Sequence, residues 1–489
     1  MNTTNTRRVS LGLRADGARR SAATLSFLTL APLFISACGF PRPPLLGNDT
    51  PGDAGGTDGS GNSAGSDASN APGDTGGPAA PPDPGTTIHV SPNGDDANDG
   101  LVMPVKTLRH AIGLAAADPT LTGIVLAAGT YSVATGELFP YTVPANITIA
   151  GPAGGGALLA GNQAGPGITV ARGTLQDIDL QGFVTAITAT GTAQFKNIRV
   201  LTSSIAIQAE TSANLTVDNL SITGSAGACS TGIVLNGLAQ LKMNTVVTGN
   251  LGGVLSANDH SSANITSANI TGDSNCTASI LKFVSDRNFT LQDAVLQGGN
   301  VGIESGSLSP DVNLTMLTNV VIRSMKSAAL NIGGTFQDNT ALMMIGGELS
   351  GTSSGSMNCG RANMFMTDVT ITQNTGLALF AFECSLTMRG CTVIGNGGGL
   401  SFEQLRTTDL GTSSSLGGNT FQNNKFAQVF VMDSDSLGPV VIEAVGNTWN
   451  PRAQMADDHG HYDSSLNPVR GPSQGDNYGL AASNLSIDL

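Results

Sequence analysis

The stretch Leu215–Gly224 has the sequence Leu-Thr-Val-Asp-Asn-Leu-Ser-Ile-Thr-Gly, in which two short runs of alternating apolar residues flank a polar turn position. Alternation with a period of two is typical of a strand that buries one face. Asn219 stands at the turn, and asparagine tolerates a left-handed or tight-turn backbone better than most residues. The residue after the turn, Leu220, is again apolar and is predicted to point inward.

This pattern recurs along the chain after Pro144. It is found in Leu175–Gly182, Phe195–Leu201, Leu215–Gly224, Leu314–Arg323, Met364–Gln373 and Leu386–Asn396, and residues of the turn type stand at Asp177, Asn197, Asn219, Asp293, Asn319, Asp368 and Gly390. A second short strand recurs in step at Ile187, Ile207, Ile233, Val254, Ile280, Ile303 and Leu330. The common period indicates a solenoid, whose coils bury their apolar faces by stacking on their neighbours.

Two solenoid types share this period, the parallel β-helix and the leucine-rich repeat. The L-x-x-L-x-L-x-x-N spacing of leucine-rich repeats does not recur, and the sequence lacks helix formers for a convex face. Glycine accounts for 64 of 489 residues and charged residues for only 12%, a composition that favours strands and turns. We therefore expect an all-β fold, a single-stranded right-handed parallel β-helix solenoid with a short N-terminal capping helix, over residues 87–450.

The segment before the repeat supports this prediction. It contains the strand Ile88–Val90, the loop Asp95–Gly100, a helix capped by Thr107 with Leu108, Ala111, Ile112 and Ala115 on one face, and the strand Gly123–Tyr131. From Ile88 to Ser132 this order resembles the DUF1565 family, whose members look like pectate-lyase-type right-handed β-helices. The resemblance implies an N-terminal cap at residues 87–135, with the helix lying across the open end of the solenoid.

The N-terminus has the features of an exported lipoprotein. Five arginines precede an apolar run from about Ala22 to Ile35, as in a secretory signal peptide, and the run is too short for a membrane span. Ile35-Ser36-Ala37-Cys38 resembles the lipobox of bacterial lipoproteins, which implies a signal peptide at residues 1–37 and lipidation of Cys38. The alternative is an ordinary signal peptide with an incidental cysteine. The residue after the cysteine is Gly39 rather than Asp, which resembles lipoproteins that are released to the outer membrane. We therefore expect the chain at the outer membrane, on its periplasmic or extracellular face.

Residues 38–86 form the predicted linker. From Asn48 to about Thr86 the sequence is nearly all Gly, Ser, Asp, Asn, Ala, Thr and Pro, with too little apolar surface to offset chain entropy. No Lys or Arg occurs from Pro43 to Val105. The net charge of -14 for the whole chain also argues against nucleic acid as a partner, because phosphate backbones would be repelled.

Five cysteines follow Cys38, so at least one of them stays unpaired within the chain. Cys391 follows the Gly390 turn and is most simply a buried apolar residue. Cys359 and Cys384 lie about one coil apart and are the better disulfide candidates, while Cys229 and Cys276 lie about two coils apart.

The best candidates for catalysis are Glu383 and Glu403, each preceded by phenylalanine. This shared context predicts two carboxylates on adjacent coils, roughly 5 Å apart by strand spacing, and Asp433 extends the column. Such a pair can act as acid and base in a polysaccharide lyase or glycosidase, or hold a cation. The alternative is a solvated pair of carboxylates on an exposed sheet.

Two further segments are candidate metal sites. Asp95, Asp96 and Asp99 offer oxygen ligands for Ca²⁺, although a turn satisfied by its own hydrogen bonds explains the same residues. His459 and His461 lie among acidic residues and can share a metal, but the segment 451–489 is better explained as a C-terminal cap or tail. No cofactor is required by any other motif, and Ca²⁺ is the one metal that the sequence suggests.

Three functions fit the sequence. The first is a non-catalytic surface lipoprotein whose rows of Thr, Ser, Asn and Gln bind a polysaccharide or a surface protein. The second is a polysaccharide lyase or glycoside hydrolase, and the third is a purely structural spacer. We favour the first, because clustered charges are rare in the sequence, although its single Trp and four Tyr offer few stacking platforms for sugars.

Overall fold

The computed structural model describes residues 85–284, 288–307, 313–334, 340–404, 406–425, 428–433, 440–450, 469–470 and 485–488. All of them fall within one unit of contacts, Pro78–Leu489. The signal peptide, Cys38, nearly all of the linker, and His459 and His461 lie outside the described residues. The described part of the chain contains no helix long and apolar enough to cross a membrane.

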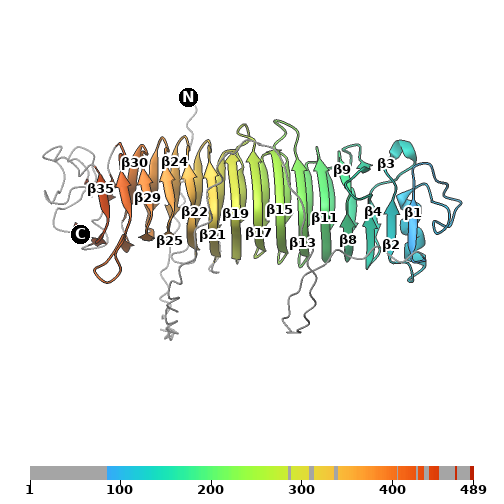
Figure 1. The fold of residues 1–489 in the computed structure, drawn as a ribbon, viewed down its shortest axis with the longest axis horizontal. Helices are drawn as coiled ribbons and strands as arrows, with labels where there is room; N and C mark the ends of the chain where they lie inside the picture. The colour runs from blue at the N-terminus through green and yellow to red at the C-terminus, as the bar shows by residue number, and fades with distance from the viewer. Residues whose placement is uncertain are drawn as a thin grey trace, which may run out of the picture. The chain divides into compact units, whose positions relative to one another are not determined.

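The strands form two parallel sheets (Figure 1). Sheet A contains β1 (Thr87–Val90), β2 (Gly123–Leu126), β3 (Gly129–Ser132), β5 (Ile147–Ala150), β6 (Ala157–Ala160), β8 (Gly173–Gln176), β9 (Asp179–Gln181), β11 (Thr192–Leu201), β13 (Asn214–Thr223), β15 (Gln240–Leu251), β17 (Ser262–Gly272), β19 (Asn288–Gly298), β21 (Asn313–Arg323), β23 (Thr340–Ser350), β25 (Asn363–Thr367), β26 (Thr370–Thr372), β28 (Ser385–Arg389), β29 (Thr392–Ile394), β31 (Thr408–Asp409), β32 (Thr420–Gln422), β34 (Val440–Glu443), β35 (Thr448–Asn450) and β37 (Leu485–Asp488).

Sheet B contains the shorter strand of each coil. Its members are β4 (Tyr141–Val143), β7 (Ile168–Val170), β10 (Thr185–Ala189), β12 (Ile205–Ala209), β14 (Thr231–Leu235), β16 (Gly253–Asn258), β18 (Ser279–Val284), β20 (Val301–Ser307), β22 (Ala328–Gly334), β24 (Gly355–Gly360), β27 (Leu377–Phe382), β30 (Gly398–Glu403), β33 (Val429–Asp433) and β36 (Val469–Arg470). Each strand pairs with the equivalent strand of the next coil, as in a right-handed parallel β-helix. The predicted fold class is confirmed.

In the coils from β8 and β9 to β28 and β29, a left-handed residue divides the sheet A part of each coil into two arms. Asn197 and Asn219 have φ of 52° and 56°, and the pairing of β11 with β13 passes over them. The inward alternation restarts after this residue, so apolar side chains of both arms point into one continuous core. We call the part before this residue the first arm and the part after it the second arm. All seven turn residues predicted from the sequence have positive φ, which confirms that part of the pattern.

The second short strand predicted in each coil belongs to sheet B. The core residue predicted for this strand needs correction in two coils. Register aligns Ile207 with Ile233, Ile233 with Leu255, and Leu255 with Leu281. Val254 and Ile280 therefore stand one residue before the predicted column. Both members of each doublet are buried, so the apolar pattern alone could not select the aligned one.

The N-terminal cap also matches its prediction. Thr107 caps α1 (Leu108–Ala117), its hydroxyl accepting a hydrogen bond from the His110 backbone N–H at 3.1 Å. Leu108, Ala111 and Ala115 are buried, and α1 packs against β1, β2 and β4, the first strands of both sheets. A short 3-10 helix, η1 (Val133–Thr135), follows β3. At the other end, β36 and β37 pair with β33 and β34, so paired strands continue into residues 451–489.

A ladder of buried asparagines supports the C-terminal coils. The Asn374 side chain donates to Asn396 Oδ1 at 2.8 Å, and the Asn396 side chain donates to Asn424 Oδ1 at 2.9 Å. The same oxygens accept backbone N–H groups at 3.1 Å. Each amide thus satisfies backbone groups that the turns leave unpaired inside the solenoid.

We predict that Asn396→Leu lowers the free energy of unfolding by about 3 kcal/mol, because it leaves the backbone N–H and one side-chain N–H of Asn374 buried without an acceptor, while the other side-chain N–H still donates to the Leu349 carbonyl. Asn219→Gly is the matched control, since Asn219 is exposed and glycine keeps its left-handed backbone. Urea unfolding of both variants measures the difference. Equal stabilities would show that the buried ladder is dispensable.

Candidate functional site

The cysteines form two disulfides in the structure. Cys359 near the end of β24 and Cys384 in the turn after β27 have Cα atoms 6.3 Å apart. Cys229 and Cys276 have Cα atoms 5.5 Å apart across 47 residues. Cys391 is a free thiol, and its burial raises its pKa to about 11, which disfavours the reactive thiolate.

The predicted alignment of Glu383 with Glu403 is wrong. Register places Glu403 opposite Phe382, and Phe402 opposite Ala381. Glu383 is one residue further along, in a left-handed turn with φ of 50°, and Gln404 occupies the following position with φ of 53°. The phenylalanines that suggested equal contexts point to opposite sides of their strands, because side chains alternate along a strand. Backbone register also pairs Glu403 with Asp433, across an irregularity.

Arginines flank Glu383. The Glu383 carboxylate lies 3.2 Å from Arg361 Nε and 3.9 Å from Arg406 Nη2. Arg361 also stands over the Phe382 ring at 5.8 Å. Sequence reasoning missed Arg361, since its role depends on the turn of the preceding coil. The arrangement is that of an ion-paired turn next to the Cys359–Cys384 disulfide, and it lacks the two aligned carboxylates that the acid and base assignment required.

The acidic loop binds its own backbone. Asp96 accepts hydrogen bonds from the backbone N–H groups of Lys106 and Thr107, both at 2.8 Å, and from the Thr107 hydroxyl. Asp95 accepts from Ala97, and Asp99 accepts from Leu101 and Val102. No cluster of three His, Cys, Asp or Glu side chains suited to a metal occurs among the described residues. These contacts are those of the alternative explanation, a turn satisfied by its own hydrogen bonds.

Glu137 is a second carboxylate at the start of α1, and its role was not predicted from the sequence. It is almost fully buried, accepts from the backbone N–H of Leu108 at 2.8 Å, and accepts from the Tyr141 hydroxyl at 2.6 Å. Burial raises the pKa of Glu137. Because Glu137 is 29 residues from Leu108 in the sequence, no local motif announces it. Its contacts explain it as a helix cap.

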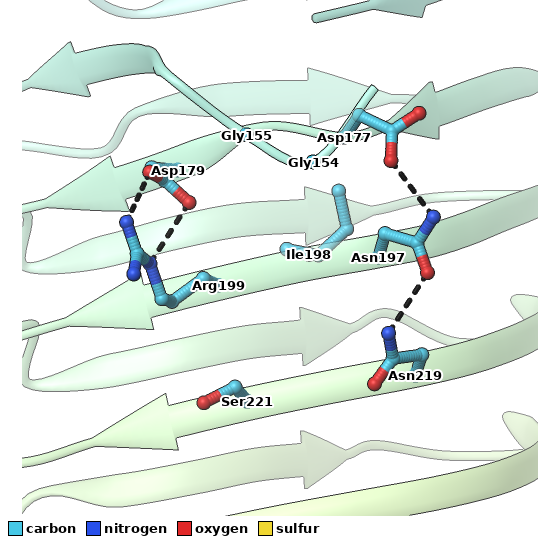
Figure 2. A pocket seen from close by; sticks show the side chains of 9 residues that line it. All are labelled: Gly154, Gly155, Asp177, Asp179, Asn197, Ile198, Arg199, Asn219 and Ser221. Atoms are coloured by element: carbon cyan, nitrogen blue, oxygen red, sulfur yellow. Dashed lines mark hydrogen bonds and ion pairs between the residues drawn. The ribbon is translucent and has the colours of Figure 1, made fainter. Parts of the chain in front are cut away.

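A hollow of about 380 Å³ lies at the bend between the arms, beside Gly154 and Gly155 (Figure 2). Its polar side chains other than Ser221 are already paired with one another. Asn197 donates to Asp177 at 2.7 Å, and Asn219 donates to Asn197 at 2.9 Å. Arg199 makes a two-pronged ion pair with Asp179. A ligand would have to compete with these contacts.

A different hollow, of about 440 Å³, lies on the first arms of β13, β15, β17 and β19. We call it the first-arm hollow. Its polar lining consists of Asn214, Thr216, Gln240, Lys242, Ser262, Asn264, Asn288 and Thr290. Register brings these side chains into two adjacent columns, one beginning with Asn214 and the other with Thr216. No hydrogen bond or ion pair joins these eight side chains to any other described residue.

The two hollows therefore differ in available hydrogen-bonding capacity. At the bend, the side chains satisfy one another and stabilise the turn. In the first-arm hollow, amide, hydroxyl and ammonium groups face solvent and remain available to a ligand. We take the first-arm hollow as the candidate functional site.

A protein family of unknown function, DUF1565, matches residues 92–386. No protein of curated function matches the chain. Among solved structures, the catalytic domain of a GH87 α-1,3-glucanase in complex with nigerose is similar at 13% identity and a TM-score of 0.45, over 84% of this chain and 69% of that one. The A-module of the Azotobacter vinelandii mannuronan C-5 epimerase AlgE4 has 12% identity and a TM-score of 0.38, over 78% and 95% of the two chains.

PfbA, a surface adhesin of Streptococcus pneumoniae, has 10% identity and a TM-score of 0.34, over 71% of this chain and 93% of that one. At such scores the likeness assigns no activity to this chain, and these proteins themselves differ in what they do.

We predict that Asp96→Asn destabilises the domain by about 1 kcal/mol at neutral pH, because it removes the charge that accepts three hydrogen bonds at the start of α1. Burial opposes ionisation of Asp96, but the hydrogen bonds from Thr107 and Lys106 outweigh it and lower its pKa. A lowered folded pKa stabilises the fold above the ordinary carboxyl range, and this contribution is lost as the pH falls through the folded pKa.

The difference in the free energy of unfolding between wild type and Asp96→Asn should accordingly shrink in acid. Urea unfolding at neutral pH and at pH values below the ordinary carboxyl range measures this difference. Asp95→Asn is the control, since the Asp95 side chain accepts only a local turn hydrogen bond, from the Ala97 backbone N–H, among the described residues. A difference that is constant with pH would contradict the assignment of Asp96 as an ionised cap.

Proposed function

The chain belongs to the DUF1565 family, and we propose that it is a non-catalytic binding scaffold that holds carbohydrate in the first-arm hollow. The observation that carries this proposal is the set of eight polar side chains in the hollow, none of which has a partner among the described residues. Amides and hydroxyls both donate and accept hydrogen bonds, as sugar hydroxyls do. Lys242 is the one charged side chain in the described lining, so the hollow suits a ligand of low charge density.

Rigidity supports the same function. The hollow lies on paired strands of four coils, and the backbone hydrogen bonds of those coils fix the spacing of the side chains. A ligand would therefore meet groups that are held in place before it arrives, which lowers the entropy that binding costs. A purely structural spacer has no need of a hollow lined by unpartnered polar groups.

The lyase or glycosidase alternative has less support. It depended on two aligned carboxylates, and register separates Glu383 from Glu403 while Arg361 and Arg406 flank Glu383. The binding experiment below includes a test for turnover, so that it decides between the two functions.

We further propose that the chain is a lipoprotein of the outer membrane, anchored through Cys38. This part of the proposal is supported by the sequence Ile35-Ser36-Ala37-Cys38 after an apolar run, and by the linker composition of residues 38–86. The anchor and linker would hold the solenoid at the surface, where polysaccharides are available as ligands.

We predict that Asn264→Ala weakens polysaccharide binding about fivefold, because it removes an amide from the centre of the first-arm hollow. Asn269→Ala is the matched control: Asn269 is an exposed asparagine of the same strand, β17, on the second arm. Calorimetric titration of both variants with a panel of mannan, glucan, xylan, alginate and pectin measures the effect. Reducing and unsaturated ends are assayed in the same samples.

Failure of every polysaccharide to bind would refute the carbohydrate proposal. Equal losses in Asn264→Ala and Asn269→Ala would place the ligand elsewhere. Product formation by the wild type would replace the binding scaffold with an enzyme.

We predict that Cys38→Ala moves the full-length protein from the membrane fraction to the soluble fraction of a Gram-negative bacterial host, because the thiol is the acylation point of a lipobox. Incorporation of labelled palmitate into the wild type, and its loss in the variant, is the direct readout. Cys391→Ala, which changes a buried free thiol of the solenoid, is the control. Palmitate incorporation that persists in Cys38→Ala would contradict the anchor assignment.

A further inference from the structure

The first-arm surface changes character beyond the hollow. The outward column that begins with Thr216, Lys242, Asn264 and Thr290 continues, coil by coil, with Met316, Met343 and Phe365. In the next column, Thr318 of β21 aligns with Ile345 of β23. We call Met316, Met343, Ile345 and Phe365 the apolar strip. The polar hollow, on β13 to β19, and the apolar strip, on β21 to β25, thus lie one after the other on the same face of sheet A (Figure 1).

The apolar strip is exposed. Phe365 is 44% exposed and Ile345 is 42% exposed, and Met316 and Met343 are partly exposed between the hollow and Phe365. Elsewhere on the first arms of β11 to β19 the outward positions are polar. Large apolar side chains gathered on one outward face mark a binding surface more often than isolated ones do.

The strip ends at a charged pair. The column continues from Phe365 to Thr387 and then Asp409, whose carboxylate accepts from Arg389 Nη2 at 2.6 Å. The Arg389 guanidinium also donates to the Ser415 hydroxyl and to backbone carbonyls. These groups are satisfied within the protein, so the surface available to a ligand runs from β13 to β25.

We propose, building on the proposed carbohydrate function, that the ligand is an extended polysaccharide lying parallel to the solenoid axis, with its hydroxyls in the first-arm hollow and the apolar faces of its rings on Met343, Ile345 and Phe365. Pyranose rings carry polar hydroxyls and an apolar face of C–H groups, and aromatic side chains stack against such faces. The first-arm surface offers both kinds of group, polar side chains in the hollow and apolar side chains in the strip, in one row on one face.

Geometry favours a polymer over a compact ligand. Successive outward side chains are one strand spacing apart, and six spacings separate β13 from β25, about 29 Å in all. A chain that repeats along its own axis can meet this row of groups at every step. A short oligosaccharide reaches either the hollow or the strip, and only a longer chain reaches both, so affinity should rise with chain length.

The test compares long and short size fractions of each polysaccharide in the mannan, glucan, xylan, alginate and pectin panel, by calorimetric titration of the full-length protein. We expect the long fraction to bind wild type at least about tenfold more tightly than the short fraction. Phe365→Ala should abolish that difference and leave binding of the short fraction in the hollow unchanged. Phe365→Tyr, which keeps a ring, should retain it.

Leu238→Ala is the matched control, since Leu238 is an exposed apolar residue outside the strip. Binding that is independent of chain length, or equally affected by Phe365→Ala and Leu238→Ala, overturns this inference while leaving the carbohydrate function intact. Absence of binding by every fraction refutes both. Concentration-dependent self-association of wild type that Phe365→Ala removes, with glycan binding unchanged, would show that the strip binds a second copy of the chain.

Discussion

The left-handed residue at the bend of the coils from Asp177 to Gly390 is the constraint on which the rest of this structure depends. A strand buries every second side chain, so one long straight strand could present an apolar row to only one side. The positive φ at positions such as Asn197 and Asn219 turns the chain and restarts the alternation, and both arms then point their apolar residues into one core. Asparagine, aspartate and glycine hold most of these positions because they reach this backbone at the lowest cost.

Stacking follows from the bend. Because each coil repeats the same turn, its neighbours align residue for residue, and outward side chains form columns along the axis. Columns at the bend are used internally, as in the chain of contacts from Asp177 through Asn197 to Asn219. The two columns that line the first-arm hollow have no such partner among the described residues, and one of them continues with Met343 and Phe365. The division between structural and available columns locates the candidate site.

The sequence predicted the features that repeat and missed those that depend on contacts between distant coils. The turn residues, the α1 cap and the parallel β-helix could be derived, since a periodic pattern or a local motif carries each of them. The register predicted from the sequence was wrong where two apolar residues are adjacent, as at Val254 and Leu255. It was also wrong at Glu383 and Glu403, because the phenylalanine before each suggested that the two positions were equivalent. Glu137 and Arg361 could not be found, because their partners lie 29 and 22 residues away with no connecting pattern.

Hydroxyl-radical footprinting of the solenoid, with and without a bound polysaccharide, tests the central claim most directly because it reports which face the ligand covers. Met343 and Phe365 on the first arms should lose reactivity on binding, while Phe382, which ends β27 beside Glu383 on sheet B, should stay equally reactive. Protection of Phe382 with unchanged reactivity at Met343 and Phe365 would contradict the account and place the ligand at the turn that carries Glu383.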